Sequence, residues 1–329
     1  MDVAGWVWGA TAVFVVGLIV FDFYAHVRTP HAPSFSESAR WSIFYIVLAL
    51  VFGVVVGLAW GWGPGTEYFA GYITEKSLSV DNLFVFLIIM TKFAVPREYQ
   101  QKVLLVGVVI ALVLRTVFIL AGAAAIEQFS WVFYIFGAFL VYTAVKLARE
   151  HHDAEHPDPR EERDGIAVRL FKRFVPTVEE YHGDRLTVRL DGKRFFTPML
   201  VVMVAIGSTD VLFALDSIPA IYGLTEEPYI VFTANAFALM GLRQLYFLIG
   251  GLLDRLVYLS YGLSIILAFI GVKLVLHALH ENTLGFVNGG EHVAVPEVST
   301  VLSLTVIIGV LAVTTVASLL KTRNTTPAK

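Results

Sequence analysis

The sequence contains no cysteine and few charged residues. The missing cysteines exclude disulfide bonds, iron–sulfur clusters and metal sites built from thiolates. Charged residues make up 16% of the 329 residues, whereas a soluble domain carries about 25%. Hydrophobic residues make up 57% of the chain, and the mean hydropathy is +0.72. A soluble globular domain is therefore excluded, and we expect the chain to lie in a membrane.

Long apolar runs recur along the chain and predict about nine membrane-spanning helices. A helix needs about 20 apolar residues to cross the hydrocarbon core, and a β-barrel would show alternation instead of continuous runs. The predicted fold class is all-α, a polytopic membrane helical bundle. We place the spans at 5–24, 41–60, 70–91, 103–125, 131–148, 197–221, 229–252, 257–279 and 300–320.

Lysine and arginine are absent from every second connection between the predicted spans. Cytoplasmic loops collect these two residue types, so the connections that hold Glu67 and Glu127 are predicted to lie outside, and those that hold Arg97 and Lys102 inside. This places the N-terminus outside and the C-terminus in the cytoplasm, and we expect a bacterial inner (plasma) membrane. No basic stretch precedes the first apolar run, which favours a retained span over a cleaved signal peptide.

Two segments of the chain are similar to each other. Glu75 and Asp81 are six residues apart, as are Asp210 and Asp216, and LRTVFILAG (114–122) matches LRQLYFLIG (242–250). Each copy holds three spans, an odd number, which predicts an inverted repeat of the kind found in many secondary transporters. The predicted organisation is a two-span N-terminal extension (1–69), repeat 1 (70–148), a cytoplasmic loop with a small hairpin (149–196), repeat 2 (197–280), and an outer loop, last span and cytoplasmic tail (281–329).

Acidic side chains interrupt the third and sixth predicted spans. A carboxylate at the centre of the bilayer costs roughly 2.5–3.5 kcal/mol on insertion scales, so Asp81, Asp210 and Asp216 must be protonated, paired or coordinating a cation. Further oxygen ligands flank them at Glu75, Ser79, Asn82, Thr209 and Ser217. Carboxylate and other oxygen ligands suit Mg²⁺, Ca²⁺ and Mn²⁺. The two spans therefore predict an all-oxygen site for a hard divalent cation.

On a straight helix, two residues six positions apart point about 120° away from each other. We therefore expect the sixth span to be broken near Gly207, Ser208 and Pro219, since such residues loosen the backbone. In an alternative interpretation, Arg115 and Arg243 pair with the buried acids and merely hold helices together. Asp22, near the end of the first span, is either an interfacial residue or a vestibule carboxylate.

At these residues the chain resembles the TerC/Alx family of integral membrane proteins, and its Alx-like branch in particular. The resemblance rests on stretches such as GYITEKSLSVDNLFVF (71–86), YHGDRLTVRLDGKRFFTP (181–198) and STDVLFALDSIPAIYGLT (208–225), and it covers nearly the whole chain. The family takes its name from tellurium resistance, and the resemblance implies export of Mn²⁺. It implies metal ligands at Glu75, Asp81, Asn82, Asp210, Asp216 and Ser217, with support from Ser79, Thr209, Arg115, Arg243, Gly207 and Pro219. Many family members carry an acid where this chain has Gly207.

The leading hypothesis is a secondary transporter that exports a divalent cation, Mn²⁺ above others, from the cytoplasm, with protons as a candidate coupling ion. The alternative is a membrane assembly or stress-resistance scaffold whose buried ion pairs are structural. The chain has no Walker motif, so we do not expect ATP to drive the transport. We do not expect an enzyme, because Ser208 has no mid-span histidine to act as its base. The expected partners are the lipid bilayer and the transported cation, with no tightly bound cofactor and no nucleic acid.

Overall fold

The computed structural model describes residues 1–28, 31–128, 131–153, 175–178, 180–190, 193–249, 256–280, 288, 291, 293–296 and 298–322. Within its helices, the side chains of residues 81, 84, 125–128, 150–153, 212, 215, 216 and 249 lie outside the description. The side chains of Asp81 and Asp216, two of the predicted ligands, are therefore not placed.

Helices dominate the described chain, and one short hairpin interrupts them. The helices are α1 (Gly5–Asp22), continued by the π-helical turn η1 (Phe23–Val27), α2 (Phe35–Trp60), α3 (Trp62–Lys92), α4 (Arg97–Gln128), α5 (Val132–Asp153), α7 (Pro198–Tyr222), α8 (Pro228–Leu239), α9 (Leu242–Ile249), α10 (Leu259–His280) and α11 (Thr300–Thr322). Strands β1 (Thr187–Leu190) and β2 (Lys193–Phe196) pair antiparallel, where the sequence predicts a hairpin.

Local sequence explains where several helices begin. Ser34 is the N-cap of α2, and its hydroxyl accepts a hydrogen bond from the Glu37 N–H at 3.2 Å, as a capping box predicts. Proline stands in the first turn of α7 and of α8, a position in which its missing N–H costs no helical hydrogen bond.

Seven of the described helical segments are long and apolar enough to cross a membrane, which confirms a polytopic helical membrane protein. The two predicted spans outside this set are the acidic ones. They correspond to α3, of 31 residues, and α7, of 25 residues, in which the apolar piece Pro198–Val211 is shorter than a membrane span. The count of nine spans stays a prediction.

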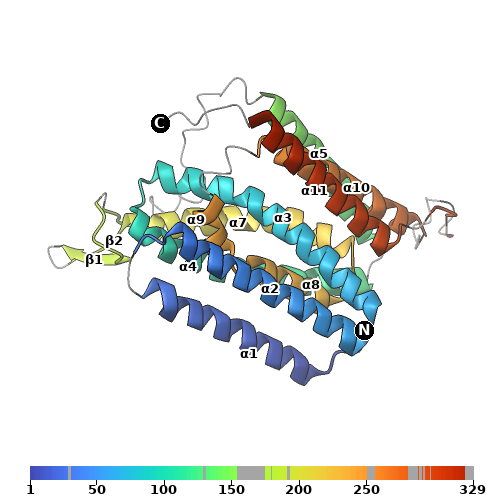
Figure 1. Cartoon of the computed structure of the whole chain (residues 1–329), viewed down its shortest axis with the longest axis horizontal. Helices are drawn as coiled ribbons and strands as arrows, with labels where there is room; N and C mark the ends of the chain where they lie inside the picture. The colour runs from blue at the N-terminus through green and yellow to red at the C-terminus, as the bar shows by residue number, and fades with distance from the viewer. Residues whose placement is uncertain are drawn as a thin grey trace.

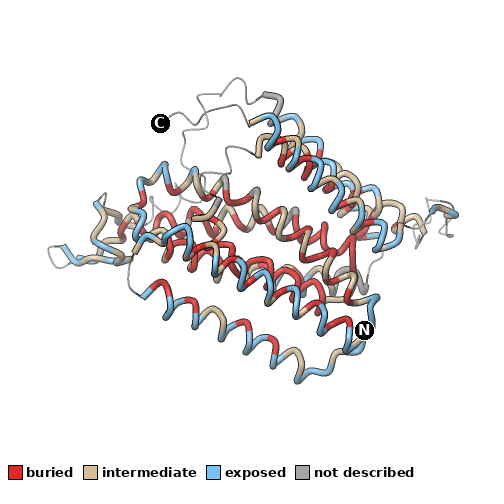
Figure 2. The backbone as a smooth tube through the Cα atoms, viewed as in Figure 1, coloured by how far each residue is buried: buried red, intermediate tan, exposed pale blue. Residues whose placement is uncertain are grey.

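The helices form a bundle with α8 at its centre and α1 and α11 at its edges (Figure 1). Along the span that contains α8, 89% of the residues are buried, against 17% for the α1 span and 11% for α11. Figure 2 shows the same gradient, since the buried backbone runs through the middle of the molecule and the edge helices are largely exposed. The apolar outer faces of α1 and α11 are suited to contact lipid.

The central helices pack in a regular pairing. Helix α3 packs against α8, α4 against α7, and α5 along the length of α10. In the predicted repeat, α3, α4 and α5 correspond to α7, α8–α9 and α10. Exchanging the two copies turns the α3–α8 contact into the α7–α4 contact and leaves the α5–α10 contact unchanged. This is the pairing that a two-fold axis between the units would produce, although the repeat relation itself stays a prediction.

The expected break in the sixth span is wrong, because α7 runs unbroken from Pro198 to Tyr222 through Gly207, Ser208 and Pro219. Thr209 and Ser208 donate their hydroxyl hydrogen bonds to the Ala205 carbonyl of the same helix. Pro219 lies within the last turn, so it removes a single ladder hydrogen bond near the helix end.

The interruption lies instead in the seventh predicted span, which divides into α8 and α9 at Met240 and Gly241. Met240 has an extended backbone, and Gly241 has a φ of 74°, a conformation that glycine adopts readily. A Cβ atom at Gly241 would lie 2.9 Å from Cβ of Tyr45 in α2. Glycine is therefore required here both by the backbone and by the close approach of α2.

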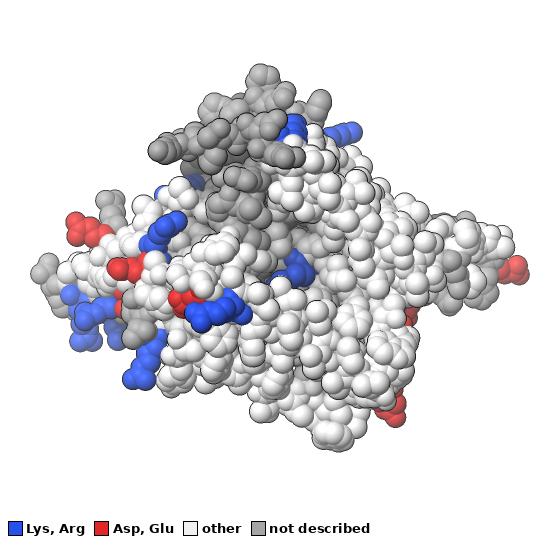
Figure 3. All heavy atoms as spheres, in the orientation of Figure 1, with Lys and Arg blue, Asp and Glu red and all other residues white. Residues whose placement is uncertain are grey.

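Charged side chains gather at the ends of the bundle. Figure 3 shows Lys and Arg side chains, interspersed with acidic ones, at the end that carries β1 and β2, and acidic side chains alone at the opposite end of this face. The hairpin belongs to the predicted cytoplasmic loop, so the basic end agrees with the predicted inner side.

Candidate cation site

The structure brings predicted site residues from α3, α4 and α7 together around Arg115. Its guanidinium forms an ion pair with the Glu75 carboxylate. Nε and Nη2 donate to the two Asp210 oxygens, each at 3.4 Å, and Nη1 donates to Oγ of Ser217 at 3.0 Å. Glu75 and Arg115 are 0% exposed and Asp210 2%. Two buried carboxylates therefore face one buried cation inside the bundle.

The contact between Arg115 and Asp210 is bidentate but long. Charge-assisted N–H···O bonds are normally about 2.7–2.9 Å, so both of these contacts lie at the weak end of hydrogen bonding. Neither Glu75 oxygen makes a hydrogen bond of standard geometry with the residues that the structure describes. The carboxylates therefore keep lone pairs that a second cation could use.

Two buried hydroxyls on α3 are also unused. Oγ1 of Thr74 and Oγ of Ser79 have no hydrogen-bond partner within the described chain, and each residue is 1% exposed. Ser79 lies four residues after Glu75, on the same face of the helix. Its hydroxyl is therefore a candidate oxygen ligand beside the Glu75 carboxylate.

The remaining predicted residues divide between other roles. Asn82 is buried, and within the described part of the chain no hydrogen bond joins it to the Arg115 cluster. Thr209 donates to its own helix, as described above, and Gly207 lies against α4, where an added Cβ would come within 3.2 Å of Cγ2 of Ile110. Arg243, expected as a support of the site, lies in a different cluster. The structure thus joins Glu75, Asp210 and Ser217 around Arg115, and it leaves Asn82, Thr209, Gly207 and Arg243 outside this cluster.

Among the described residues, no group of three histidine, aspartate or glutamate side chains is arranged to hold a metal ion. The site as described has two carboxylates, one serine hydroxyl and one arginine. It presents the hard oxygen atoms that divalent cations prefer, while the guanidinium supplies the positive charge.

Arg243 pairs with Asp22 of α1 in a second buried cluster. Nη2 of Arg243 donates to Oδ1 of Asp22 at 2.7 Å, and Gln244 and Tyr45 donate to the same oxygen, each at 3.1 Å. Gln101 of α4 accepts a further hydrogen bond from Nη1 of Arg243. Asp22 is 7% exposed and serves as the counter-ion of Arg243, and both alternatives for it, an interfacial residue or a vestibule carboxylate, stay predictions.

Lys76 donates hydrogen bonds to backbone carbonyls at the break between α8 and α9. Its Nζ donates to the carbonyl oxygens of Ala238 and Met240 at 2.9 and 3.2 Å. These carbonyls belong to the end of α8, where no following helical turn supplies donors, and a cation is favoured at a helix C-terminus. The sequence does not predict this role for Lys76, since its acceptors are backbone atoms that no sequence motif shows.

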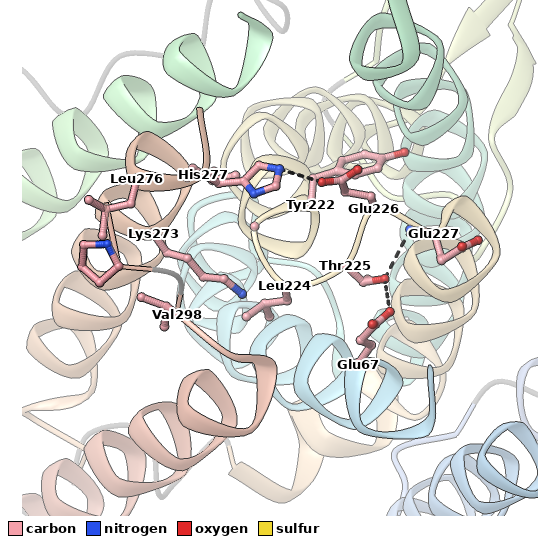
Figure 4. Close-up of a pocket in the computed structure, with 13 residues that line it drawn as sticks. Glu67, Tyr222, Leu224, Thr225, Glu226, Glu227, Lys273, Leu276, His277 and Val298 are labelled. Atoms are coloured by element: carbon pink, nitrogen blue, oxygen red, sulfur yellow. Dashed lines mark hydrogen bonds and ion pairs between the residues drawn. The ribbon is translucent and has the colours of Figure 1, made fainter. Parts of the chain in front are cut away.

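A pocket of about 390 Å³ lies beyond the Arg115 cluster, at the predicted outer end (Figure 4). Its polar lining comes from α3, the connection between α7 and α8, and α10. Thr225 donates to Oε2 of Glu67 at 2.6 Å, and His277 lies 2.8 Å from the Glu226 carboxylate. The hydrogen bond from His277 holds the pKa of Glu226 below its usual range. The pocket contains none of the predicted ligands, so it is separate from the Arg115 cluster.

The chain matches the sequence pattern of the family described as "Integral membrane protein TerC family" over residues 60–326. The chain belongs to the TerC family. The match covers both acidic helices and Arg115, and it excludes α1 and nearly all of α2. The segment that matches the TerC family therefore includes the candidate cation site, whereas Asp22 lies outside it.

Similar proteins extend over the N-terminal helices as well. The chain is 52% identical over 324 residues to the uncharacterized membrane protein Rv2723 of Mycobacterium tuberculosis, covering 98% of this chain and 81% of that protein. It is 38% identical over 317 residues to the uncharacterized membrane protein STKORF319 of Myxococcus xanthus, covering 96% and 93%. It is 38% identical over 281 residues to the "Putative membrane-bound redox modulator Alx" of Escherichia coli K12, covering 82% and 85%. No solved structure matches the chain significantly.

Proposed function

We propose that this TerC protein is a secondary transporter that exports a divalent metal cation, with Mn²⁺ as its principal substrate, from the cytoplasm. The observation that carries the proposal is the convergence of Glu75 and Asp210, from α3 and α7, on one buried point with Ser217. Carboxylates inside a membrane bundle are costly and typically mark ion pathways. All-oxygen ligation and the absence of cysteine favour a hard ion over a soft one.

In this proposal, the guanidinium of Arg115 supplies the positive charge of the site when no transported ion is bound. A fully buried pair of carboxylates requires a counter-charge, and the guanidinium supplies it. A divalent cation that binds Glu75 and Asp210 must displace Arg115, because the two positive species would otherwise repel each other at close range. The long contacts of 3.4 Å to Asp210 suit an exchange of this kind.

The arrangement of the helices supports a path for the transported cation and a mechanism of coupling. The pocket at Glu67 lies about 12 Å along α3 from Glu75, at a rise of about 1.5 Å per residue, and we assign it as the outer exit. The α3–α8 and α4–α7 pairing supports two units that rock about the site, as in other transporters with inverted repeats. Protonation of the same carboxylates from the outer side would release the ion, which makes the proton the proposed coupling ion.

The deciding experiment measures Mn²⁺ flux into or out of proteoliposomes with an imposed pH gradient. We expect flux in the native protein and its loss in Asp210→Asn and in Glu75→Gln. Asp184→Asn is the matched control, because Asp184 pairs with Lys102 outside the bundle core at 2.7 Å and should leave transport intact. Native protein that inserts and folds but carries no Mn²⁺ would contradict the proposal.

The ion pairs at Arg115 and Arg243 are also what a membrane scaffold would contain. The exporter and the scaffold differ in how deletion of the protein changes cytosolic manganese. Deleting an exporter raises cytosolic manganese in medium that contains the metal, whereas deleting a scaffold leaves cytosolic manganese unchanged.

A further inference from the structure

Asn235 is an uncharged polar residue at the centre of α8, and it is unusual among the buried groups of the bundle. It is 0% exposed, and neither its Oδ1 nor its Nδ2 has a hydrogen-bond partner in the described chain. Buried side-chain amides almost always have partners, and an exception calls for a ligand, an ion or a water. Its neighbour Thr233, also 0% exposed, shows the usual solution, because its hydroxyl donates to the Tyr229 carbonyl at 2.8 Å.

The packing of α8 against α4 places Asn235 at the depth of the Arg115 cluster. Val231 shares a buried apolar cluster with Ile119 of α4, and Arg243, in α9 beyond the break, bonds to Gln101 nearer the start of α4. The chain from α8 into α9 therefore runs antiparallel to α4. Asn235 lies one turn after Val231, and Arg115 lies one turn before Ile119. Asn235 and Arg115 are therefore displaced from Val231 and Ile119 in the same direction across the membrane.

Helices α7 and α3 place their acidic residues at the same depth in the bundle as Asn235. Val231 also packs with Ala214 of α7, and Asp210 lies one turn before Ala214, on the side of Arg115. On α3, an added Cβ at Gly71 would come within 3.3 Å of Cβ of Ala234, the residue before Asn235, and Glu75 is one turn further along. The backbones of three helices thus bring Glu75, Asp210 and Asn235 to one layer.

We infer that Asn235 is a further ligand of the cation site and contributes its side-chain carbonyl oxygen to the bound divalent ion. This inference rests on the proposed function. Amide carbonyls are regular ligands of hard divalent cations, and a neutral ligand adds coordination without adding a charge that must itself be neutralised. When the ion is absent, Arg115 pairs with both carboxylates, but the amide of Asn235 has no partner among the described residues.

The test is Mn²⁺ binding to the purified, detergent-solubilised full-length chain, measured by the electron paramagnetic resonance signal of free Mn²⁺. We expect Asn235→Ala to weaken Mn²⁺ binding threefold or more. Thr233→Ala is the matched control, because it removes a buried polar group from the same helix but one that is already satisfied, and it should bind as the native chain does. Asp210→Asn, measured in parallel, reports on the site itself.

The outcomes separate the two ideas. If Asp210→Asn weakens binding and Asn235→Ala changes it less than threefold, Asn235 is no ligand and the proposed function stands. If Asp210→Asn also binds as the native chain does, the proposed site is wrong, and the inference falls with it. Should Asn235→Ala fail to fold, Asn235→Asp replaces it, with binding at least threefold tighter expected and an unchanged affinity overturning the inference.

Discussion

Arg115 holds the candidate site together as one side chain shared by two acids. Its guanidinium contacts Glu75, Asp210 and Ser217 from inside the bundle. A buried ion pair adds little net stability, but removing one partner is costly because it leaves the other charge without compensation. The same side chain therefore stabilises the empty protein and opposes the entry of a second cation.

Arg115→Gln should destabilise the protein by about 3–5 kcal/mol, because it leaves two carboxylates facing each other in a buried site. If the site accepts divalent cations, Mn²⁺ should restore part of this loss, since an ion that binds only the folded state stabilises it. Thermal unfolding in detergent, with and without Mn²⁺, measures both effects.

Arg189→Gln serves as the control, because Arg189 lies on the exposed strand β1 and its loss should change stability little. An Arg115→Gln protein whose unfolding temperature does not respond to Mn²⁺, in a range where the native protein binds the ion, would count against exchange between arginine and metal.

A charge inside an apolar span stands out, and the sequence therefore singled out Glu75 and Asp210, which the structure places in one buried cluster with Arg115. The sequence did not identify their partners. The repeat pointed to equivalent roles for Arg115 and Arg243, but Arg243 pairs with Asp22, more than 200 positions away in the chain. Asn235 was missed because a single amide interrupts an apolar run far less than a charge does. Its signal was present as the one asparagine within VFTANAFAL (231–239).

At the scale of the element, the interrupted helix lies beside the acidic helices and not within them. The prediction placed the break in α7 on the evidence of Gly207, Ser208 and Pro219, which are local signals. Tertiary packing decided otherwise, because Gly207 serves the close approach of α4 and the hydroxyl of Ser208 bonds within its own helix. The sequence did not predict the break at Gly241, since an isolated glycine in an apolar run can equally continue a helix.

Gly241→Ala should destabilise the protein by more than about 1 kcal/mol, since alanine disfavours a φ of 74° and its Cβ would press on Tyr45. Gly309→Ala, in α11, is the matched control. No atom lies within 4 Å of an added Cβ at that position, and the substitution should stabilise the helix by roughly 0.5–1 kcal/mol. Chemical unfolding of both variants in detergent checks the pair, and equal effects would refute a specific requirement at the break.

At the scale of the whole molecule, the charge distribution predicts how the bundle sits in the membrane. The absence of native cysteine makes every introduced cysteine unique. We expect Glu67→Cys, which lines the open pocket, to react with a membrane-impermeant maleimide from outside intact cells. Arg97→Cys, at the exposed start of α4, should react only after the cells are opened. The reverse pattern would invert the topology.

The N-terminal extension is joined to the core by charge. Asp22→Asn should destabilise the protein by an amount on the order of 3–5 kcal/mol, because Arg243 would keep its buried charge without a counter-ion. The unfolding temperature measures this loss, and Asp2→Asn is the control at the other end of the extension. A neutral result for Asp22→Asn would mean that a second acid or solvent reaches Arg243.

The placement of Asp22 also limits how this protein can be divided. The boundary of the TerC match at residue 60 suggests that the first two helices could be removed or exchanged between relatives as a separate module. Because the only carboxylate shown in contact with Arg243 in the described chain belongs to that module, a shortened protein would carry an orphan guanidinium in its interior. Chimeras should therefore transfer Asp22 and Arg243 together, or neither of them.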